Sequence, residues 1–149
     1  MSSVSPLGDV YQAGTLSGCP LAMACGLETL KIIEEMDAYS HLEKIGKVLD
    51  KLVRRKLSHQ IEKGRVLYTR IGSMFCFFME LENDPKNFSE VTRMNENLFS
   101  ELYVFLLQSG LYFGPSGYET AFLNIHHREE DLVLLVDAIS MFFKEKYSV

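Results

Sequence analysis

The segment from Tyr11 to Pro20 reads Y-Q-A-G-T-L-S-G-C-P and lies directly before a long helical pattern. Its two glycines let the backbone come close to a ligand, and a helix N-terminus offers free N–H groups and the positive end of a dipole. Thr15 adds a hydroxyl that can donate to an anion. This combination suits a phosphate group. The alternative is an ordinary helix entry, in which the glycines form a turn and Pro20 takes the first helical position.

The composition limits the kind of protein. A chain of 149 residues can form one domain with a hydrophobic core, and its net charge of −5 argues against a surface for nucleic acid or acidic membranes. The N-terminus has no signal-peptide pattern, and no apolar run is long enough to span a bilayer. The three cysteines lack C-x-x-C spacing. We therefore expect a cytoplasmic protein with reduced thiols that binds neither nucleic acid nor membrane.

Hydrophobic periodicity predicts the element order α-α-β-β-α-β-β-α. The first helix is expected over residues 20–36, with Cys19 as a weak N-cap, and a capping box of Ser40 and Glu43 opens the second, which ends by Gly64. The remaining expected elements are strands over 65–70 and 73–81, a helix over 91–105 with a stop at Gly110, strands over 111–113 and 121–125, and a last helix that opens at 129–131. This order predicts an α+β fold with a short, mostly antiparallel sheet and helices packed on one side.

Three segments resemble one enzyme family. The first is Y-Q-A-G-T-L-S-G, and the second, Arg70–Phe75, reads R-I-G-S-M-F. The third, Gly114–Phe122, reads G-P-S-G-Y-E-T-A-F, and H-R-E-E-D follows it at residues 127–131. In this order they are similar to motifs of the glutamate-1-semialdehyde 2,1-aminomutase family, class III pyridoxal-phosphate aminotransferases of fold type I. The resemblance covers nearly the whole chain but only the C-terminal part of the family.

The resemblance implies a function for the intact enzyme. The family is an isomerase of tetrapyrrole (porphyrin) biosynthesis: it moves an amino group within the small molecule glutamate 1-semialdehyde to give 5-aminolevulinate, using pyridoxal 5'-phosphate, and it works as a homodimer. The lysine that holds this cofactor and the acidic partner of its ring lie in a large domain that precedes the Y-Q-A-G-T segment. No lysine of this chain has a matching context. We therefore expect a fragment that is inactive alone and does not bind the cofactor covalently.

The resemblance also implies roles for three residues. Gly14 and Thr15 match the family's phosphate-binding motif, whose threonine reaches the cofactor of the neighbouring subunit. Glu119 matches a glutamate that reaches toward substrate and cofactor, and is the candidate catalytic residue. Gly117 and Tyr118 replace commoner residues beside it, which leaves the shape of that loop open. Residues 1–18 would form an arm of the cofactor-binding region, and residues 19–149 the small C-terminal domain.

Other chemistry is less well supported by the sequence. His126 and His127 are neighbours on an expected strand, so their side chains point to opposite faces and no metal site is predicted. Cys76, within an apolar strand, is expected in the core rather than as a nucleophile. Two alternatives remain for the whole chain: a fragment of another class III aminotransferase with an external amine acceptor, or a non-catalytic α+β module used for association.

Overall fold

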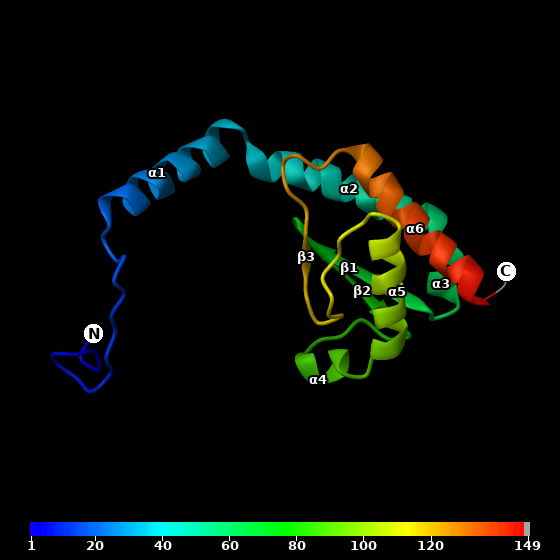
Figure 1. Cartoon of the computed structure of the whole chain (residues 1–149), viewed down its shortest axis with the longest axis horizontal. Helices are drawn as coiled ribbons and strands as arrows, with labels where there is room; N and C mark the ends of the chain where they lie inside the picture. Colours follow the sequence, from blue (N-terminus) through cyan, green and yellow to red (C-terminus); the bar gives the residue numbers. More distant parts are fainter. Residues whose placement is uncertain (148–149) are drawn as a thin grey trace. The chain divides into compact units, whose positions relative to one another are not determined.

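The computed structural model describes residues 1–147, and its contacts divide the chain into two compact units, Met1–Ala38 and Tyr39–Val149. Figure 1 follows the elements along the chain. The first unit holds an irregular segment and helix α1. The second holds nearly all of the remaining helices and the sheet, so we describe each unit by itself.

Helix α1 spans Pro20–Glu35 and begins as the sequence predicts. Pro20 occupies the first turn, where its missing N–H costs nothing, and Cys19 at the N-cap makes no capping hydrogen bond through its side chain. The backbone leaves the helix at Met36, and Asp37 takes a left-handed conformation with φ of 45°. None of the 16 residues of α1 is buried.

Helix α2 spans Ala38–Lys56, and the short helix α3 spans Ser58–Glu62. The predicted capping box is wrong, because α2 starts two residues before Ser40 and Glu43 turns toward the sheet. The predicted single helix is also broken at Leu57, whose side chain is fully buried. Gln60 of α3 is buried as well, and its side-chain oxygen accepts a hydrogen bond of 3.0 Å from Arg65.

The sheet has three antiparallel strands in the order β1-β2-β3. β1 is Val66–Ile71, β2 is Met74–Met79, and β3 is only Ala121–Phe122. The strand predicted over residues 111–113 does not form: this stretch leaves helix α5 through a bond from the Leu111 N–H to the Leu106 carbonyl and runs without a ladder partner. The strand predicted over 121–125 is shorter than expected because a turn begins after Asn124.

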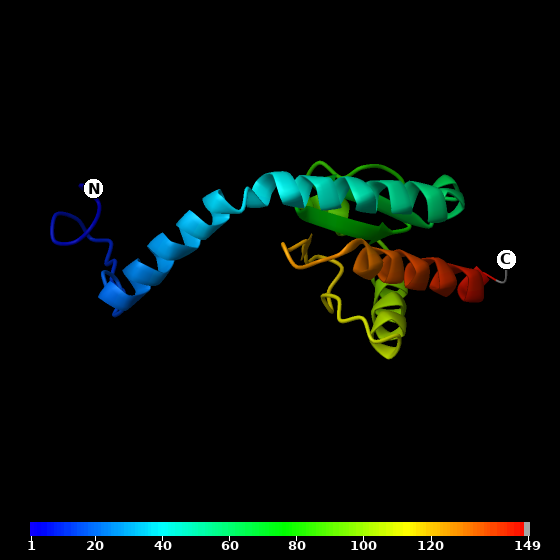
Figure 2. The same ribbon diagram turned by 90° about the horizontal axis from the view of Figure 1, so that it is seen from above.

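One face of the sheet carries the main core. Alternate residues of β2 point into it, and helices α5 (Glu96–Gln108) and α6 (Glu129–Tyr147), which lie side by side in Figures 1 and 2, pack there with α2. The fully buried side chains at its centre are Leu49, Val53, Leu57, Val66, Met79, Leu102, Leu106, Val136, Ile139 and Phe143. This arrangement confirms the predicted α+β fold with helices on one side of an antiparallel sheet.

The opposite face of the sheet is only partly covered. Phe78, Leu81 and Met94 form a small second cluster there, beneath helix α4 (Phe88–Val91). The helix predicted from Val91 is therefore two elements, because Asn95 accepts a hydrogen bond from the Leu98 N–H and starts α5 afresh. Cys76 lies on this face, half-buried at the edge of the second cluster, so it is outside the main core. Within residues 1–147, no helix is long and apolar enough to cross a membrane.

Candidate functional site

Gly14 and Thr15 lie in a turn directly before α1. The Ser17 N–H donates to the Gly14 carbonyl at 2.9 Å, and the Cys19 N–H donates to the Leu16 carbonyl at 3.0 Å. A Cβ at Gly14 would lie 2.7 Å from Oγ of Ser17, so this turn requires a glycine or a moved serine. Thr15 is exposed.

The start of α1 suits an anionic group. No side chain caps its N-terminus, and its first turn contains no acidic residue. The first N–H groups of a helix lack partners within the helix and carry a partial positive charge. With the exposed hydroxyls of Thr15 and Ser17 beside them, the residues present fit the phosphate of pyridoxal phosphate.

Glu119 lies two residues before β3, at the end of a turn closed by its own N–H on the Ser116 carbonyl at 3.0 Å. Its side chain folds against Gly114: a Cβ there would lie 2.9 Å from Oε2 and 3.2 Å from Cβ of Glu119. The residue is exposed, so its carboxylate is available to a ligand.

The loop shape that the sequence left open is well determined by packing. Gly117 is buried, and a Cβ on it would lie 2.2 Å from Cε of Met94 and 3.1 Å from Cγ of Phe99. Beside it, the Tyr118 hydroxyl donates to Glu96, and this hydrogen bond raises the pKa of the tyrosine. Gly117 and Tyr118 thus attach the Glu119 loop to the start of α5.

A cavity of about 280 Å³ lies beside this loop, between the sheet and α6. Its lining is mainly apolar, and Gly114, His127 and Asp131 contribute to it. His127 accepts a hydrogen bond of 3.0 Å at Nδ1 from the Asn124 N–H. His126 and His127 lie in a turn and not in a strand. The expectation that their side chains point to opposite faces of a strand is therefore wrong. Within residues 1–147, no three His, Cys, Asp or Glu side chains are placed to hold a metal ion.

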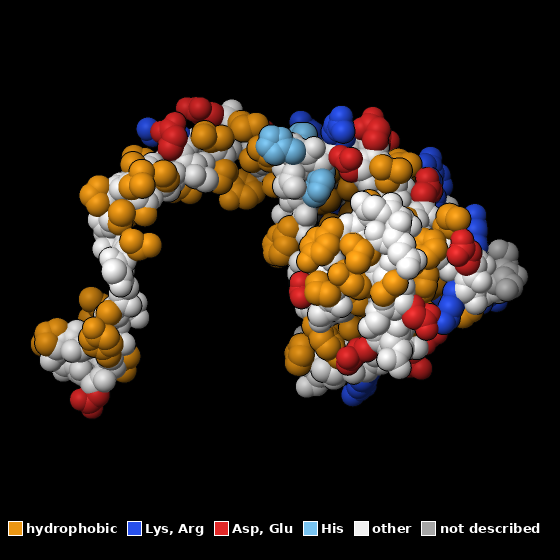
Figure 3. Space-filling model, in the orientation of Figure 1, with side chains coloured by type: hydrophobic (Ala, Val, Ile, Leu, Met, Phe, Trp, Pro, Cys, Tyr) orange, Lys and Arg blue, Asp and Glu red, His pale blue; other side chains and the backbone are white. Residues whose placement is uncertain are grey.

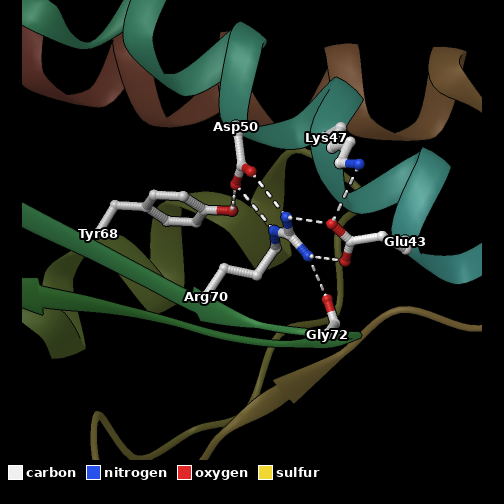
Figure 4. Close-up of polar contacts among 6 residues, drawn as sticks. All are labelled: Glu43, Lys47, Asp50, Tyr68, Arg70 and Gly72. Atoms are coloured by element: carbon white, nitrogen blue, oxygen red, sulfur yellow. Dashed lines mark hydrogen bonds and ion pairs between the residues drawn. The ribbon is translucent and has the colours of Figure 1, made fainter.

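A polar cluster joins α2 to the sheet (Figure 4). Arg70 of β1 donates from Nε and Nη2 to the two carboxylate oxygens of Asp50, at 2.9 and 2.8 Å. Its Nη1 donates to Glu43 at 2.9 Å and also to the Gly72 carbonyl. The Tyr68 hydroxyl donates to Asp50 at 2.9 Å. The Arg70 side chain is only 10% exposed, whereas its partners Asp50 and Glu43 are 25% and 43% exposed, so water partly screens these hydrogen bonds.

The contacts of the cluster lower the pKa values of its two carboxylates and raise the pKa of its tyrosine. Burial acts to raise the pKa of Asp50, but hydrogen bonds from Arg70 and Tyr68 outweigh it and lower the pKa. Hydrogen bonding to Arg70 likewise lowers the pKa of Glu43. Burial, followed by the bond to Asp50, strongly raises the pKa of Tyr68, which keeps its proton as the donor.

Arg70 stands in the motif Arg70–Phe75, but the sequence analysis gives it no role and does not predict the polar cluster around it. Two signals were present. An arginine at every-other spacing with Tyr68 and Val66 must share the core face of β1. Gly46 is an isolated glycine inside a helical pattern, which often has a packing reason. Here a Cβ on Gly46 would lie 2.5 Å from Nη1 and 2.8 Å from Cζ of Arg70.

The lysines of the chain lie at its surface. All lysines lie within residues 1–147, and none of them is buried. Lys56 pairs with Asp137, Lys146 with Glu101, and Lys47 lies 3.7 Å from Glu43. These side chains are parts of surface ion pairs.

Known proteins match this chain over nearly its whole length. It is 38% identical over 146 residues to the glutamate-1-semialdehyde 2,1-aminomutase of Clostridium kluyveri, an alignment of 95% of this chain and 33% of the relative. It is 43% identical over 141 residues to an aminomutase of the same name from Thermus thermophilus, covering 93% of this chain and 32% of the relative. The chain is homologous to a part of glutamate-1-semialdehyde 2,1-aminomutase. It spans about a third of the length of these aminomutases. No family model matches it.

Solved structures agree with this homology. The glutamate-1-semialdehyde aminomutase of Pseudomonas aeruginosa PAO1 superposes with a TM-score of 0.62 and 25% identity, over 73% of this chain and 23% of that one. A transaminase with bound PLP superposes with a TM-score of 0.68 over 97% of this chain and 31% of its own, and at 17% identity it shows the fold alone. The resemblance predicted from the motifs is thereby confirmed.

Gly14 and Thr15 belong to the first compact unit and Glu119 to the second.

Proposed function

We propose that this chain is the C-terminal part of a pyridoxal-phosphate-dependent aminomutase that converts glutamate 1-semialdehyde to 5-aminolevulinate. The observation that carries the proposal is identity of 38–43% to aminomutases over nearly the whole chain. The second compact unit provides the α+β fold that such a part requires. Because the chain spans a third of its relatives and has no suitably placed lysine, the proposal includes that it is inactive alone.

In this proposal residues 1–18 belong to the cofactor-binding region, and residues 19–149 form the small domain. Gly14 lets the backbone approach the phosphate of the cofactor, and Thr15 donates its hydroxyl to it from the neighbouring subunit of a homodimer. The open N-terminus of α1 supports this assignment. Bound pyridoxal phosphate supplies the electron sink that amine transfer between neighbouring carbons needs.

Glu119 is proposed to face the substrate. Its exposed carboxylate can accept a hydrogen bond from the amine or hold a proton near the reacting carbons. Gly114 leaves the space in which this side chain folds, and Gly117 fixes the loop on Met94 and Phe99. The cysteines form no disulfide, which supports a cytoplasmic location in the proposal.

A fusion tests this function. The chain is joined behind the first two thirds of the Thermus thermophilus aminomutase, replacing the homologous third, and 5-aminolevulinate formation is measured. We expect activity in the fusion, none in the isolated chain, and a loss of about 100-fold or more in a Glu119→Gln fusion, the typical range for a group that transfers a proton. An inactive fusion that folds and retains cofactor would favour the non-catalytic association module. Transfer of the amine to an external acceptor would favour another aminotransferase.

A further inference from the structure

The tip of the β1–β2 hairpin is attached to α2 by a side chain. The tip is the two-residue turn Gly72–Ser73, and Gly72 has a φ of 58°, a conformation that favours glycine at the first central position of such turns. Nη1 of Arg70 donates to the Gly72 carbonyl. The same guanidinium is held by Asp50 and Glu43, both on α2 (Figure 4).

The segment after Glu119 is in turn attached to this tip. The Leu123 N–H donates to the Ser73 carbonyl at 2.8 Å. Phe122 pairs with Met74 across the ladder, and Thr120 accepts a hydrogen bond from Sγ of Cys76 at 3.6 Å. β3 is only two residues long, so its place depends on the end of the hairpin that it pairs with.

We propose that Arg70 is a positioning residue for Glu119. It acts through the hairpin tip: the guanidinium fixes the Gly72 carbonyl relative to α2, the adjoining Ser73 carbonyl fixes Leu123, and β3 sets the end of the loop that presents Glu119. The effect of Arg70 on the reaction rests on the role proposed above for Glu119.

The chemistry of the cluster explains why this residue is an arginine. The planar guanidinium meets Asp50 with two parallel hydrogen bonds and still has donors for Glu43 and for a backbone carbonyl. A lysine has one charged nitrogen and cannot hold these three partners in one plane. Gly46 is part of the same arrangement, because the side chain of any larger residue there would displace the Arg70 guanidinium.

A positioning role differs measurably from a contribution to stability alone. Loss of global stability accelerates exchange of all amides that exchange through complete unfolding, by the same factor. Loss of positioning accelerates exchange at the tip and at β3 beyond that factor. The ratio of the exchange rate of the Leu123 amide to that of the Ile139 amide, in the core of α6, therefore separates the two.

The experiment measures this ratio by hydrogen exchange and NMR in the whole chain. Arg70→Met removes the guanidinium and keeps much of its aliphatic length. Gly46→Ala keeps the charge but places a Cβ against it, and so reports even where Arg70→Met does not fold. The matched control is Gly26→Ala on α1, where nothing lies within 4 Å of the added Cβ.

We expect the ratio to rise about tenfold or more in Arg70→Met and Gly46→Ala, to stay raised in Arg70→Lys, and to be unchanged in Gly26→Ala. Equal acceleration of both amides, or an unchanged Leu123 amide, would overturn the inference. The outcome is independent of the aminomutase assay, in which the Glu119→Gln fusion tests the proposed function separately.

Discussion

Asp50 on α2 accepts two hydrogen bonds from Arg70 on β1, with 2.9 Å from Nε to Oδ1 and 2.8 Å from Nη2 to Oδ2. A third comes from the Tyr68 hydroxyl. Together they hold the pKa of Asp50 below its ordinary value of 3.8. The ionised carboxylate therefore stabilises the folded state above that ordinary pKa, and the contribution is lost as the pH falls through it toward the lower folded-state pKa.

The first prediction concerns Asp50→Asn. At pH 7 it should lower the free energy of unfolding by about 1–2 kcal/mol, because hydrogen bonds to a charged group are lost at a site that water partly screens. The deficit should shrink as the pH falls below the ordinary value of 3.8 toward the lower folded-state pKa, where wild-type Asp50 becomes protonated. Urea unfolding at several pH values measures it. Asp137→Asn, at a more exposed ion pair, is the control and should change stability by less than about 0.5 kcal/mol. A deficit that does not depend on pH would contradict the prediction.

The second prediction concerns Gly117→Ala. The added Cβ meets buried Met94 and Phe99, so we expect a loss of about 1–3 kcal/mol, typical of overpacking in a core. Thermal unfolding compares it with Gly26→Ala, which adds the same atom in open space. Equal stability of the two variants would mean that the loop moves to accept the methyl group.

Sequence reasoning found the elements that have strong periodicity. α1, β1, β2 and α6 are placed close to their predicted ranges, because each has an apolar pattern and a recognisable start or stop, whereas α5 begins at Glu96, five residues after the predicted start. Their order, with short strands between helices, was sufficient to predict the fold class.

The errors arise where tertiary contacts override local signals. Ser40 and Glu43 have the pattern of a capping box, but Glu43 bonds Arg70, which is far away in sequence. Residues 111–113 have strand-like composition, yet no strand lies beside them to complete a ladder. The Arg70 cluster was missed for the same reason: it joins residues 20 and 27 positions apart, and no single-sequence pattern connects them.

The third prediction concerns the isolated chain and pyridoxal phosphate. Incubation followed by borohydride reduction should leave no single lysine specifically modified, because every lysine lies on the surface or in a surface ion pair, without a buried pocket around it. Peptide mapping by mass spectrometry detects the adduct. Bovine serum albumin, treated alike, shows the level of unspecific labelling. One stoichiometrically modified lysine would overturn the view that the cofactor-bearing lysine is absent from this chain.

The fourth prediction concerns α1, whose apolar side chains are visible on its surface in Figure 3. Leu21, Met23, Leu27 and Leu30 are 57–72% exposed, and residues 20–27 include no charged side chain. We expect the chain to self-associate as its concentration rises, because exposed apolar surface of this extent is unfavourable in water. Leu27→Glu should weaken association, and Leu134→Glu on α6, with 60% exposure, should not. Sedimentation equilibrium measures both, and a monomer at all concentrations would refute the prediction.

The last prediction concerns Thr15 in the intact enzyme, for which the active fusion serves. Thr15→Ala removes a hydroxyl donor to the cofactor phosphate. A hydrogen bond to a charged group contributes roughly 1.5–3 kcal/mol, so cofactor dissociation should become about tenfold more favourable or more. Thr29→Ala is the control, because the Thr29 hydroxyl already donates to the Cys25 carbonyl within α1.

The proposed homodimer adds a sharper form of this test. If Thr15 acts across the interface, a heterodimer of one Thr15→Ala subunit with one subunit lacking a functional cofactor lysine has two unlike sites. In this dimer the site with the intact lysine lies in the Thr15→Ala subunit and receives Thr15 from the partner, so its cofactor affinity should be unchanged. In the reverse dimer, in which Thr15→Ala and the lysine substitution are in the same subunit, the site with the intact lysine should be weakened. Cofactor release from differently tagged, purified heterodimers distinguishes the two arrangements. Unchanged affinity in every Thr15→Ala dimer would reduce Gly14 and Thr15 to an ordinary helix entry, and the phosphate assignment would then have to be abandoned.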